Sequence, residues 1–284
     1  MDKLIKTLIY GGDVSVCVID VTDALNEAIK IHEFSPVGAA AFGRTLTACT
    51  FMASGLKNKE DKLYVTVKGN GVGGKITVCG DGNLFMRGAA DNPKADVPNK
   101  PNGKLDVSGF VGKSGRITVV KSMGLKEPYS GSCRIVSGEI AEDFTAYYAL
   151  SEQTPTAMAL GVLIGKDGFA LGAGGVIVQA MPGARESSLA SAEEIVKSLT
   201  DVSLKIKELG AEGVFNKYFG KEEYAEYRPL YKCACSREYV KGVVVSLGKS
   251  EAEDLIKTEG QIKIDCEFCG KSYIFTEQDV KELF

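Results

Sequence analysis

Four of the eight cysteines lie in two close pairs near the end of the chain. "YKCACSREYV" contains Cys233 and Cys235, and "CEFCGKSY" contains Cys266 and Cys269. Four thiolates are a donor set that suits tetrahedral zinc. Gly270 can adopt a positive φ, so the second pair fits a tight turn whose backbone N–H groups point at sulfur. The sequence therefore predicts a metal site formed by these four cysteines, with zinc as the favoured ion and iron as an alternative.

The first pair has an unusual spacing for a structural zinc ribbon, which usually carries Cys-x-x-Cys on both sides. Sulfurs at Cys233 and Cys235 are close enough to form a disulfide once the metal leaves, and Cys266 can pair with Cys269 in the same way. Peroxide and hypochlorous acid oxidise thiolates in surface sites. The spacing thus permits an oxidation-triggered switch, and an inert structural metal site remains open beside it.

These cysteines belong to a small C-terminal domain predicted over residues 233–284. Strand-like patterns cover residues 239–247, 261–265 and 271–276. Helices are expected at 250–260, with a capping box from Ser250 and Glu253, and at 276–284, capped by Thr276. Because this domain is short, it buries little apolar surface. We therefore expect metal binding to be coupled to its folding.

The rest of the chain predicts an α+β fold in two further parts. Residues 1–182 form the first, a mixed domain in which glycine-rich turns separate short strands from helices. The helices are expected at 21–34, 35–57 and 141–153. The strands are expected at 61–70, 73–82, 83–90, 115–122, 156–165 and 174–183.

Residues 183–232 form the second part, a helical linker. Apolar residues recur there at spacings of three and four from Leu189 to Leu209, which indicates an amphipathic helix. The segment 185–232 carries 17 charged residues in 48 positions and has no obvious core of its own. Its order should depend on what it packs against.

Several classes of function are disfavoured by composition. The whole chain has a net charge of −3, and residues 233–284 carry 7 Lys/Arg against 10 Asp/Glu. Neither charge balance favours a basic surface for nucleic acid. The start of the chain does not resemble a signal peptide, and no apolar run reaches membrane-spanning length. We expect a cytoplasmic protein whose thiols are mostly reduced, and we interpret Cys17, Cys49, Cys79 and Cys133 as buried apolar residues.

Catalytic motifs are also weak. "GNGVGG" (69–74) is followed by a strand and fits a hairpin turn, not a dinucleotide site. His32, the only histidine, has no neighbouring nucleophile in the sequence, and Cys266-x-x-Cys269 lies between strands, unlike a thioredoxin-type pair that opens a helix. An enzyme with structural zinc and a zinc-dependent adaptor remain the alternatives.

The cysteine motifs resemble a known family. "CACSRE" followed by "GQIKIDCEFCGKSYIFT" is similar to the zinc-binding redox-switch domain of the redox-regulated holdase chaperones, the 33-kDa heat-shock protein family. "HEFSPVGAAAFGRTLTA", "GNGVGGKITV", "EPYSGSCRIVSGEIAEDFTAYYALSEQTPT" and "GAGGVIVQAMPG" are similar to its N-terminal domain. Tyr239 departs from the pattern, where a second basic residue is expected after "SRE", but it is not a ligand.

The resemblance implies a function and a site. Cys233, Cys235, Cys266 and Cys269 would hold one zinc ion in a reduced, inactive form. On oxidation Cys233 would pair with Cys235 and Cys266 with Cys269, zinc would leave, and the zinc domain and then the linker would unfold. The protein would form a homodimer and bind unfolding client proteins without ATP. It would be a chaperone and not an enzyme.

Overall fold

Helix α2 (Pro36–Ala53) is buried along almost its whole length. Its small Ala and Gly residues allow close neighbours on every side, and its threonine hydroxyls donate to the carbonyl groups four residues earlier, at 2.8 Å. Ser35 caps the helix by accepting from the Gly38 N–H at 3.1 Å, with Pro36 in the first turn. A helix that is apolar all round belongs in a protein interior, which is where this one lies.

The structure is a computed structural model that describes residues 1–220 and 222–284. They divide into two compact units, Met1–Tyr231 and Lys232–Phe284. Lys221, inside the predicted linker, lies outside the described residues.

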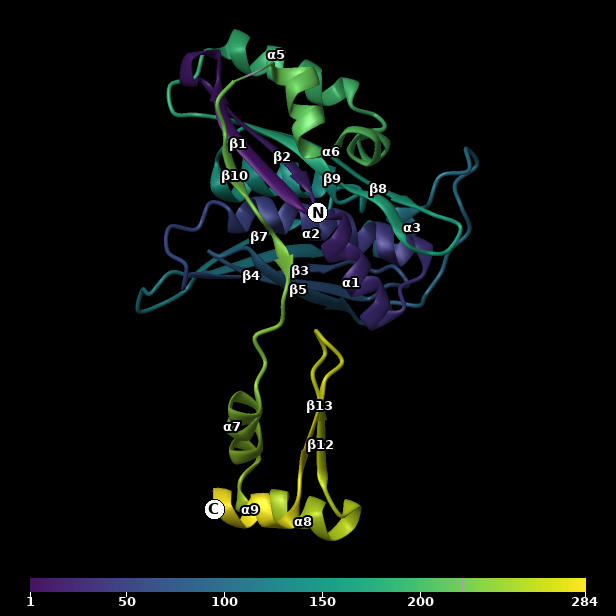
Figure 1. Ribbon diagram of the computed structural model, residues 1–284, viewed down its shortest axis with the longest axis vertical. Coiled ribbons are helices and arrows are strands. Elements are labelled where there is room, and N and C mark those ends of the chain that lie inside the picture. The colour runs from purple at the N-terminus through teal and green to yellow at the C-terminus, as the bar shows by residue number, and fades with distance from the viewer. Residues whose placement is uncertain (221) are drawn as a thin grey trace. The chain divides into compact units, whose positions relative to one another are not determined.

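Two largely antiparallel sheets enclose α2 in the first unit (Figure 1). The five-stranded sheet has the order β10-β1-β2-β9-β8, and the six-stranded sheet has the order β11-β5-β4-β3-β6-β7. Strand β11 pairs parallel with β5, and the other neighbours pair antiparallel. The strands are β1 (Lys3–Ile9), β2 (Val14–Asp20), β3 (Lys62–Lys68), β4 (Lys75–Asp81), β5 (Phe85–Ala90), β6 (Arg116–Ser122), β7 (Tyr129–Arg134), β8 (Thr156–Ile164), β9 (Ala170–Ala180), β10 (Ala225–Tyr227) and β11 (Leu230–Tyr231).

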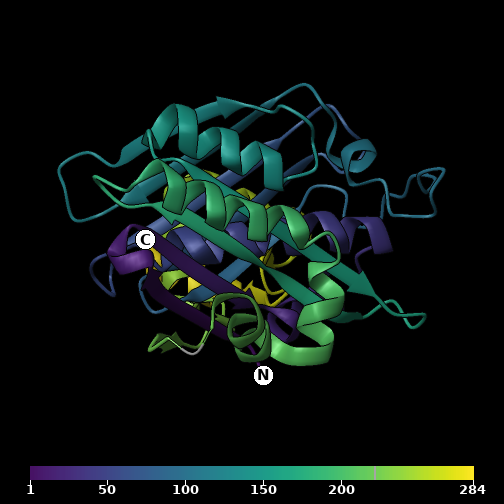
Figure 2. The same ribbon diagram turned by 90° about the horizontal axis from the view of Figure 1, so that it is seen from above.

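Helices lie on both faces of the five-stranded sheet. On the face toward α2 lie α1 (Thr22–His32) and α4 (Ala141–Tyr147), the latter continuing into a π-helical turn (Tyr148–Glu152). The opposite face is covered by α5 (Glu186–Ser198) and α6 (Val202–Phe219), as Figure 2 shows from above. The short helix α3 (Val107–Val111) packs on α2, and a 3-10 turn (Tyr10–Gly12) joins β1 to β2. The α+β fold class predicted from the sequence is confirmed.

Two apolar cores result from this layering. The larger one lies between the sheets around α2. The second, here called the outer core, lies between the five-stranded sheet and α5/α6. Its buried members are Ile5, Ile9, Val14, Val16, Val18, Val176, Val178, Ala192, Val196, Leu199, Val202, Ile206, Ala211, Val214 and Phe215.

The predicted linker is thus divided among several elements of the first unit. Its helix is not continuous to Leu209, because the chain turns between Leu199 and Asp201. A second break follows at Gly210, which interrupts α6 with φ +65°. Leu199 and Val202 keep the apolar spacing across that turn, since both face the same sheet. The periodicity therefore identified the buried face from Ala192 to Ile206, but it missed the break, and Leu209 is 41% exposed.

The predicted turns and buried cysteines can be located directly. "GNGVGG" connects β3 to β4, with Lys68 opposite Lys75, so the hairpin interpretation is confirmed. Four cysteines are buried in the first unit, and burial raises the pKa of each thiol; they are Cys17, Cys49, Cys79 and Cys133.

The second unit differs from expectation at one element. Residues 239–247 are not a strand, because helix α7 (Arg237–Leu247) occupies them. The three consecutive valines suggested β-structure, but Val240 and Val244 are one helical turn apart and both are buried, while Ser236 caps the helix by accepting from the Tyr239 N–H. Tertiary packing outweighs the β-propensity here.

The remaining elements of this unit are α8 (Lys249–Glu259), β12 (Ile262–Asp265), β13 (Ser272–Phe275) and α9 (Glu277–Leu283). The predicted capping box of Ser250 and Glu253 is wrong, since α8 begins after Gly248 without a side-chain cap. The predicted Thr276 cap of α9 is confirmed, with Asp279 completing a capping box. Seven buried side chains form the core: Val240, Val244, Ala252, Ile262, Tyr273, Phe275 and Val280.

Among the described residues, no helix combines the length and apolar character that crossing a bilayer requires.

The outer core generates a stability prediction. Phe215 is fully buried in it, so Phe215→Ala should cost about 3–5 kcal/mol of unfolding free energy and release α6 first. Leu209→Ala, on the same helix at a position 41% exposed, is the control and should stay within about 0.5 kcal/mol of the parent. Denaturant unfolding with limited proteolysis checks this. Equal effects of the two substitutions would contradict the packing described here.

Candidate metal centre

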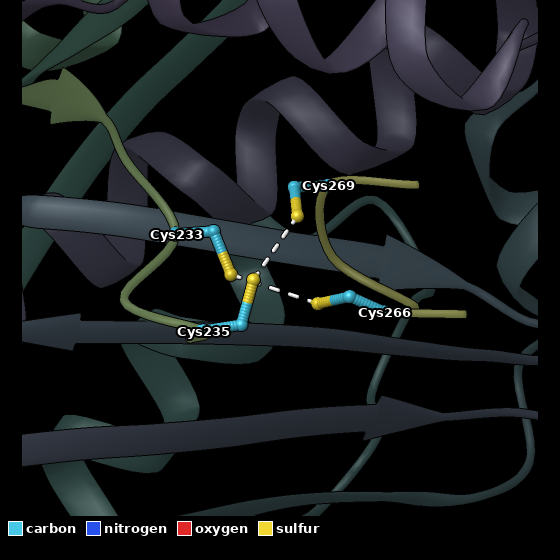
Figure 3. A group of neighbouring side chains, drawn as sticks. All are labelled: Cys233, Cys235, Cys266 and Cys269. Carbon is cyan, nitrogen blue, oxygen red and sulfur yellow. Dashed lines mark hydrogen bonds between the residues drawn. The ribbon is translucent and has the colours of Figure 1, made fainter. Parts of the chain in front are cut away.

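The sulfur atoms of Cys233, Cys235, Cys266 and Cys269 converge on one point, all within 4.8 Å of one another (Figure 3). The Sγ atoms of Cys233 and Cys266 are 3.6 Å apart, and those of Cys235 and Cys269 are 3.3 Å apart. Among residues 1–220 and 222–284, this is the one group of His, Cys, Asp or Glu side chains with metal-site geometry. The sequence grouped these four cysteines, and the structure brings them together.

A tight turn at the end of a hairpin presents Cys266 and Cys269. Strands β12 and β13 pair up to Asp265 and Ser272, and the turn closes with two hydrogen bonds, Gly270 N–H to Cys266 O and Cys266 N–H to Lys271 O, both 2.9 Å. Gly270 has φ +68°, as expected from the sequence. The pair therefore lies in a hairpin turn and not at the start of a helix, which argues against a thioredoxin-type site.

Cys233 and Cys235 come from the extended segment that precedes α7. Arg237, in the first turn of that helix, fixes the segment against the hairpin. Its guanidinium donates to Ile274 O at 2.7 Å and to Asp279 at 2.6 Å, and it lies over the Phe275 ring at 4.5 Å. One arginine thus links the first pair of cysteines to the strand that follows the second pair.

Tyr273 completes the surroundings of the cluster. It is almost fully buried, and its hydroxyl donates to Cys235 Sγ at 3.2 Å. Such contacts around a metal site orient the ligands and tune their basicity. Sequence reasoning missed both Tyr273 and Arg237. Their signals were an aromatic residue at an inward position of the strand after the second pair and a basic residue directly after "CACS".

The thiols do not ionise alike. Burial opposes charge on Cys235, but hydrogen bonds from Tyr273 and from the neighbouring thiols lower its pKa to about 7. Burial and the nearby thiols raise the pKa of Cys233, and burial with contacts to Cys235 and Cys266 raises the pKa of Cys269 to about 11. Four thiolates in this space therefore need a cation to balance them.

The donor set fits zinc. A tetrahedral ion with Zn–S bonds of about 2.3 Å separates its sulfurs by roughly 3.8 Å, and the observed contacts of 3.3 Å and 3.6 Å lie near that value. All four cysteines are partly exposed, so both an ion and a small oxidant can reach them. The four side chains could hold a metal ion.

The sole histidine lies elsewhere. His32 ends α1, and its Nε2 is 3.2 Å from the Tyr231 hydroxyl, which donates to Gly88 O at 2.8 Å. The histidine therefore lies at a helix C-terminus.

Comparisons with known proteins agree over the whole chain. A model of the Hsp33 protein family matches residues 2–276. A 33 kDa chaperonin of Bacillus cytotoxicus is 40% identical over 99% of this chain and 98% of its own, and one of Caldanaerobacter subterraneus is 38% identical over 99% and 97%. The crystal structure of a 33 kDa chaperonin from Thermotoga maritima is similar with a TM-score of 0.91, at 30% identity over 99% of this chain and 97% of that one. The chain therefore belongs to the Hsp33 family of chaperones.

Proposed function

We propose that this chaperone is an ATP-independent holdase controlled by oxidation of Cys233, Cys235, Cys266 and Cys269. The observation that carries the proposal is the four-sulfur cluster within a unit that has only seven buried apolar side chains in its core. Such a unit depends on a bound ion for its stability, and thiolate ligands make that ion removable by oxidants. The chaperone would work in the cytoplasm, where thiols are kept reduced until stress.

In the reduced state the four thiolates would bind one zinc ion, which supplies the charge balance and joins the segment 233–235 to the hairpin turn. Tyr273 donates to Cys235 and holds that ligand in place. Arg237 fixes α7 against β13. In this state α5 and α6 cover the apolar face of the five-stranded sheet.

Oxidation would remove the ligands in pairs. Two molecules of peroxide accept four electrons from four thiolates, two disulfides form, and the oxygen leaves as four waters after proton uptake. We assign the disulfides as Cys233–Cys235 and Cys266–Cys269, with release of the metal. Pairs across the cluster, such as Cys235–Cys269, would keep the two segments covalently joined, whereas pairs within each segment remove the link that the metal supplied and leave only the weaker side-chain contacts such as those of Arg237.

The connecting segment 183–232 would then unfold. Helices α5 and α6 bury their apolar side chains against the five-stranded sheet. Once they leave the sheet, they would lose their helical order. Their departure would expose the apolar face that includes Val16, Val176 and Val178. A contiguous apolar surface of this kind suits unfolding proteins, and it also suits the dimer that we propose for the oxidised form.

The first test is oxidation itself. Peroxide treatment at mildly elevated temperature should release about one zinc ion per chain with loss of about four thiols, measured with a chromogenic chelator and a thiol reagent. The oxidised protein should suppress aggregation of a thermally unfolding client at near-stoichiometric ratio, and the reduced zinc form should not. Peptide mapping should find the two local disulfides. If the metal stays bound while only other thiols oxidise, the site has a structural role and is not a redox switch.

A single ligand substitution should act like partial oxidation. Cys233→Ser should weaken zinc binding, loosen residues 233–284 and give partial activity without oxidant. Cys79→Ala, at a buried cysteine outside the cluster, is the control and should keep stoichiometric zinc. Zinc content and protease sensitivity of the linker are the measurements. A Cys233→Ser protein with full zinc and a resistant linker would count against the proposal.

The tyrosine that contacts the cluster gives a finer test. Tyr273→Phe removes the hydrogen bond to Cys235 Sγ while keeping the buried ring, so zinc affinity should fall about 10-fold or more in a chelator competition. Tyr239→Phe, at a position 72% exposed in the same unit, should leave the affinity unchanged. Identical affinities in the two variants would show that the hydroxyl contributes nothing to the site.

A further inference from the structure

Two short strands of the predicted linker occupy the edges of both sheets in the first unit. Strand β10 lies beside β1 (Figure 1). The two strands pair antiparallel, with Leu4 opposite Tyr227 and Lys6 opposite Ala225. Strand β11 pairs with β5 through two residues. Each is the outermost strand of its sheet. If the linker unfolds, β1 and β5 become edges with unpaired backbone groups.

We propose that the edge of β1, uncovered by release of β10, is a binding site for extended segments of client proteins, which add a strand to the five-stranded sheet. This inference rests on the proposed release of the linker and specifies how a client would be bound. Backbone pairing recognises an extended chain of almost any sequence, which suits a chaperone with unfolding clients.

Strand β10 holds this place weakly. It pairs with three of the seven residues of β1, and all three of its own side chains are exposed. Its additional contacts are an ion pair from Glu226 to Lys3 at 3.0 Å and, just before the strand, a hydrogen bond from the Thr7 hydroxyl to Glu223 O at 2.5 Å. A longer extended segment could pair with more of β1, as far as Ile9. A client strand could therefore form more backbone hydrogen bonds at this edge than β10 does.

The residues of β1 define what fits. Ile5 and Ile9 face the outer core, and Leu8 is 50% exposed on the other face. Lys3 lies on the same face as Ile5 and also contacts Glu212 at 3.4 Å. The site therefore favours an extended segment with an apolar side chain to cover the isoleucines and an acidic one to reach Lys3.

The chain's own occupant shows this combination. Tyr224 packs in the outer core against Phe215, with ring centroids 5.2 Å apart, and Glu226, two residues later, pairs with Lys3. Residues two apart in a strand point to the same face. The segment thus serves as a template for the partner.

A second copy of β1 fits less well than a client. Antiparallel pairing of two β1 edges about their midpoint would place Lys6 opposite Lys6, and like charges directly opposite each other destabilise a sheet. Lysines on an edge strand are a common protection against pairing with an identical edge. The charge pattern therefore favours a neutral or acidic partner.

Hydrogen exchange of the full chain tests the proposal directly. Amides of residues 3–9 that face β10 should lose protection on oxidation and regain it when a client is bound. The amides of β8, the opposite edge of the same sheet, which no linker strand covers, are the control and should not follow this pattern.

A labelled peptide of residues 222–231, EEYAEYRPLY, is the matched probe. It should bind the oxidised protein, compete with client, and bind the reduced form at least tenfold more weakly. Glu226→Lys in the peptide should weaken binding about two- to fivefold, and Lys3→Glu in the protein should restore it.

The outcomes separate the two ideas. Client binding without renewed protection of β1 and without peptide competition would overturn this inference and leave the holdase intact. Protection that returns with rising protein concentration and no client would identify a second copy as the occupant and overturn it as well. An oxidised protein that binds no client would overturn the proposed function, and this inference with it.

Discussion

Four sulfur atoms within 4.8 Å of one another are the constraint on which the C-terminal unit depends. Seven buried side chains form the rest of its core, a small number for about fifty residues, and burial disfavours charge on most of the thiols. The hairpin turn, the Arg237 contacts and the Tyr273 hydroxyl orient the sulfurs but do not balance their charge. A cation could supply this balance. In the proposed mechanism its loss would remove both the charge balance and the link between the two pairs of cysteines.

The outer core carries a comparable dependence in the first unit. Half of it belongs to the five-stranded sheet and half to α5 and α6, so neither side can bury its apolar residues alone. Gly210 and the turn before Asp201 divide the helical half into short pieces, which lowers their independent stability. In the proposed oxidised state, the valines that now pack against these helices would be available to an unfolded protein.

The sequence predicted best where chemistry or strong periodicity dominates. The paired cysteines, the buried helix after Ser35 and the Thr276 cap all correspond to local signals that the structure contains. Residues 239–247 failed because valine-rich runs favour strands, and only the packing of Val240 and Val244 selects the helix. The Tyr273 hydrogen bond to Cys235 spans 38 residues, and the pairing of β10 with β1 spans more than two hundred. Contacts of that kind cannot be read from local pattern.

Separating the sensor from the working surface resolves a chemical conflict. Thiolates that report on peroxide must be partly exposed and close together, whereas an apolar sheet face must stay covered until it is needed. In the proposed mechanism the segment between them in the sequence, which carries 17 charges in 48 residues, would link the two. Its strands also cap the edges of both sheets, so the proposed unfolding would uncover an apolar face and backbone edges together. Side-chain burial and backbone pairing are the two interactions an unfolding protein has lost, and in our proposal both would become available at the five-stranded sheet.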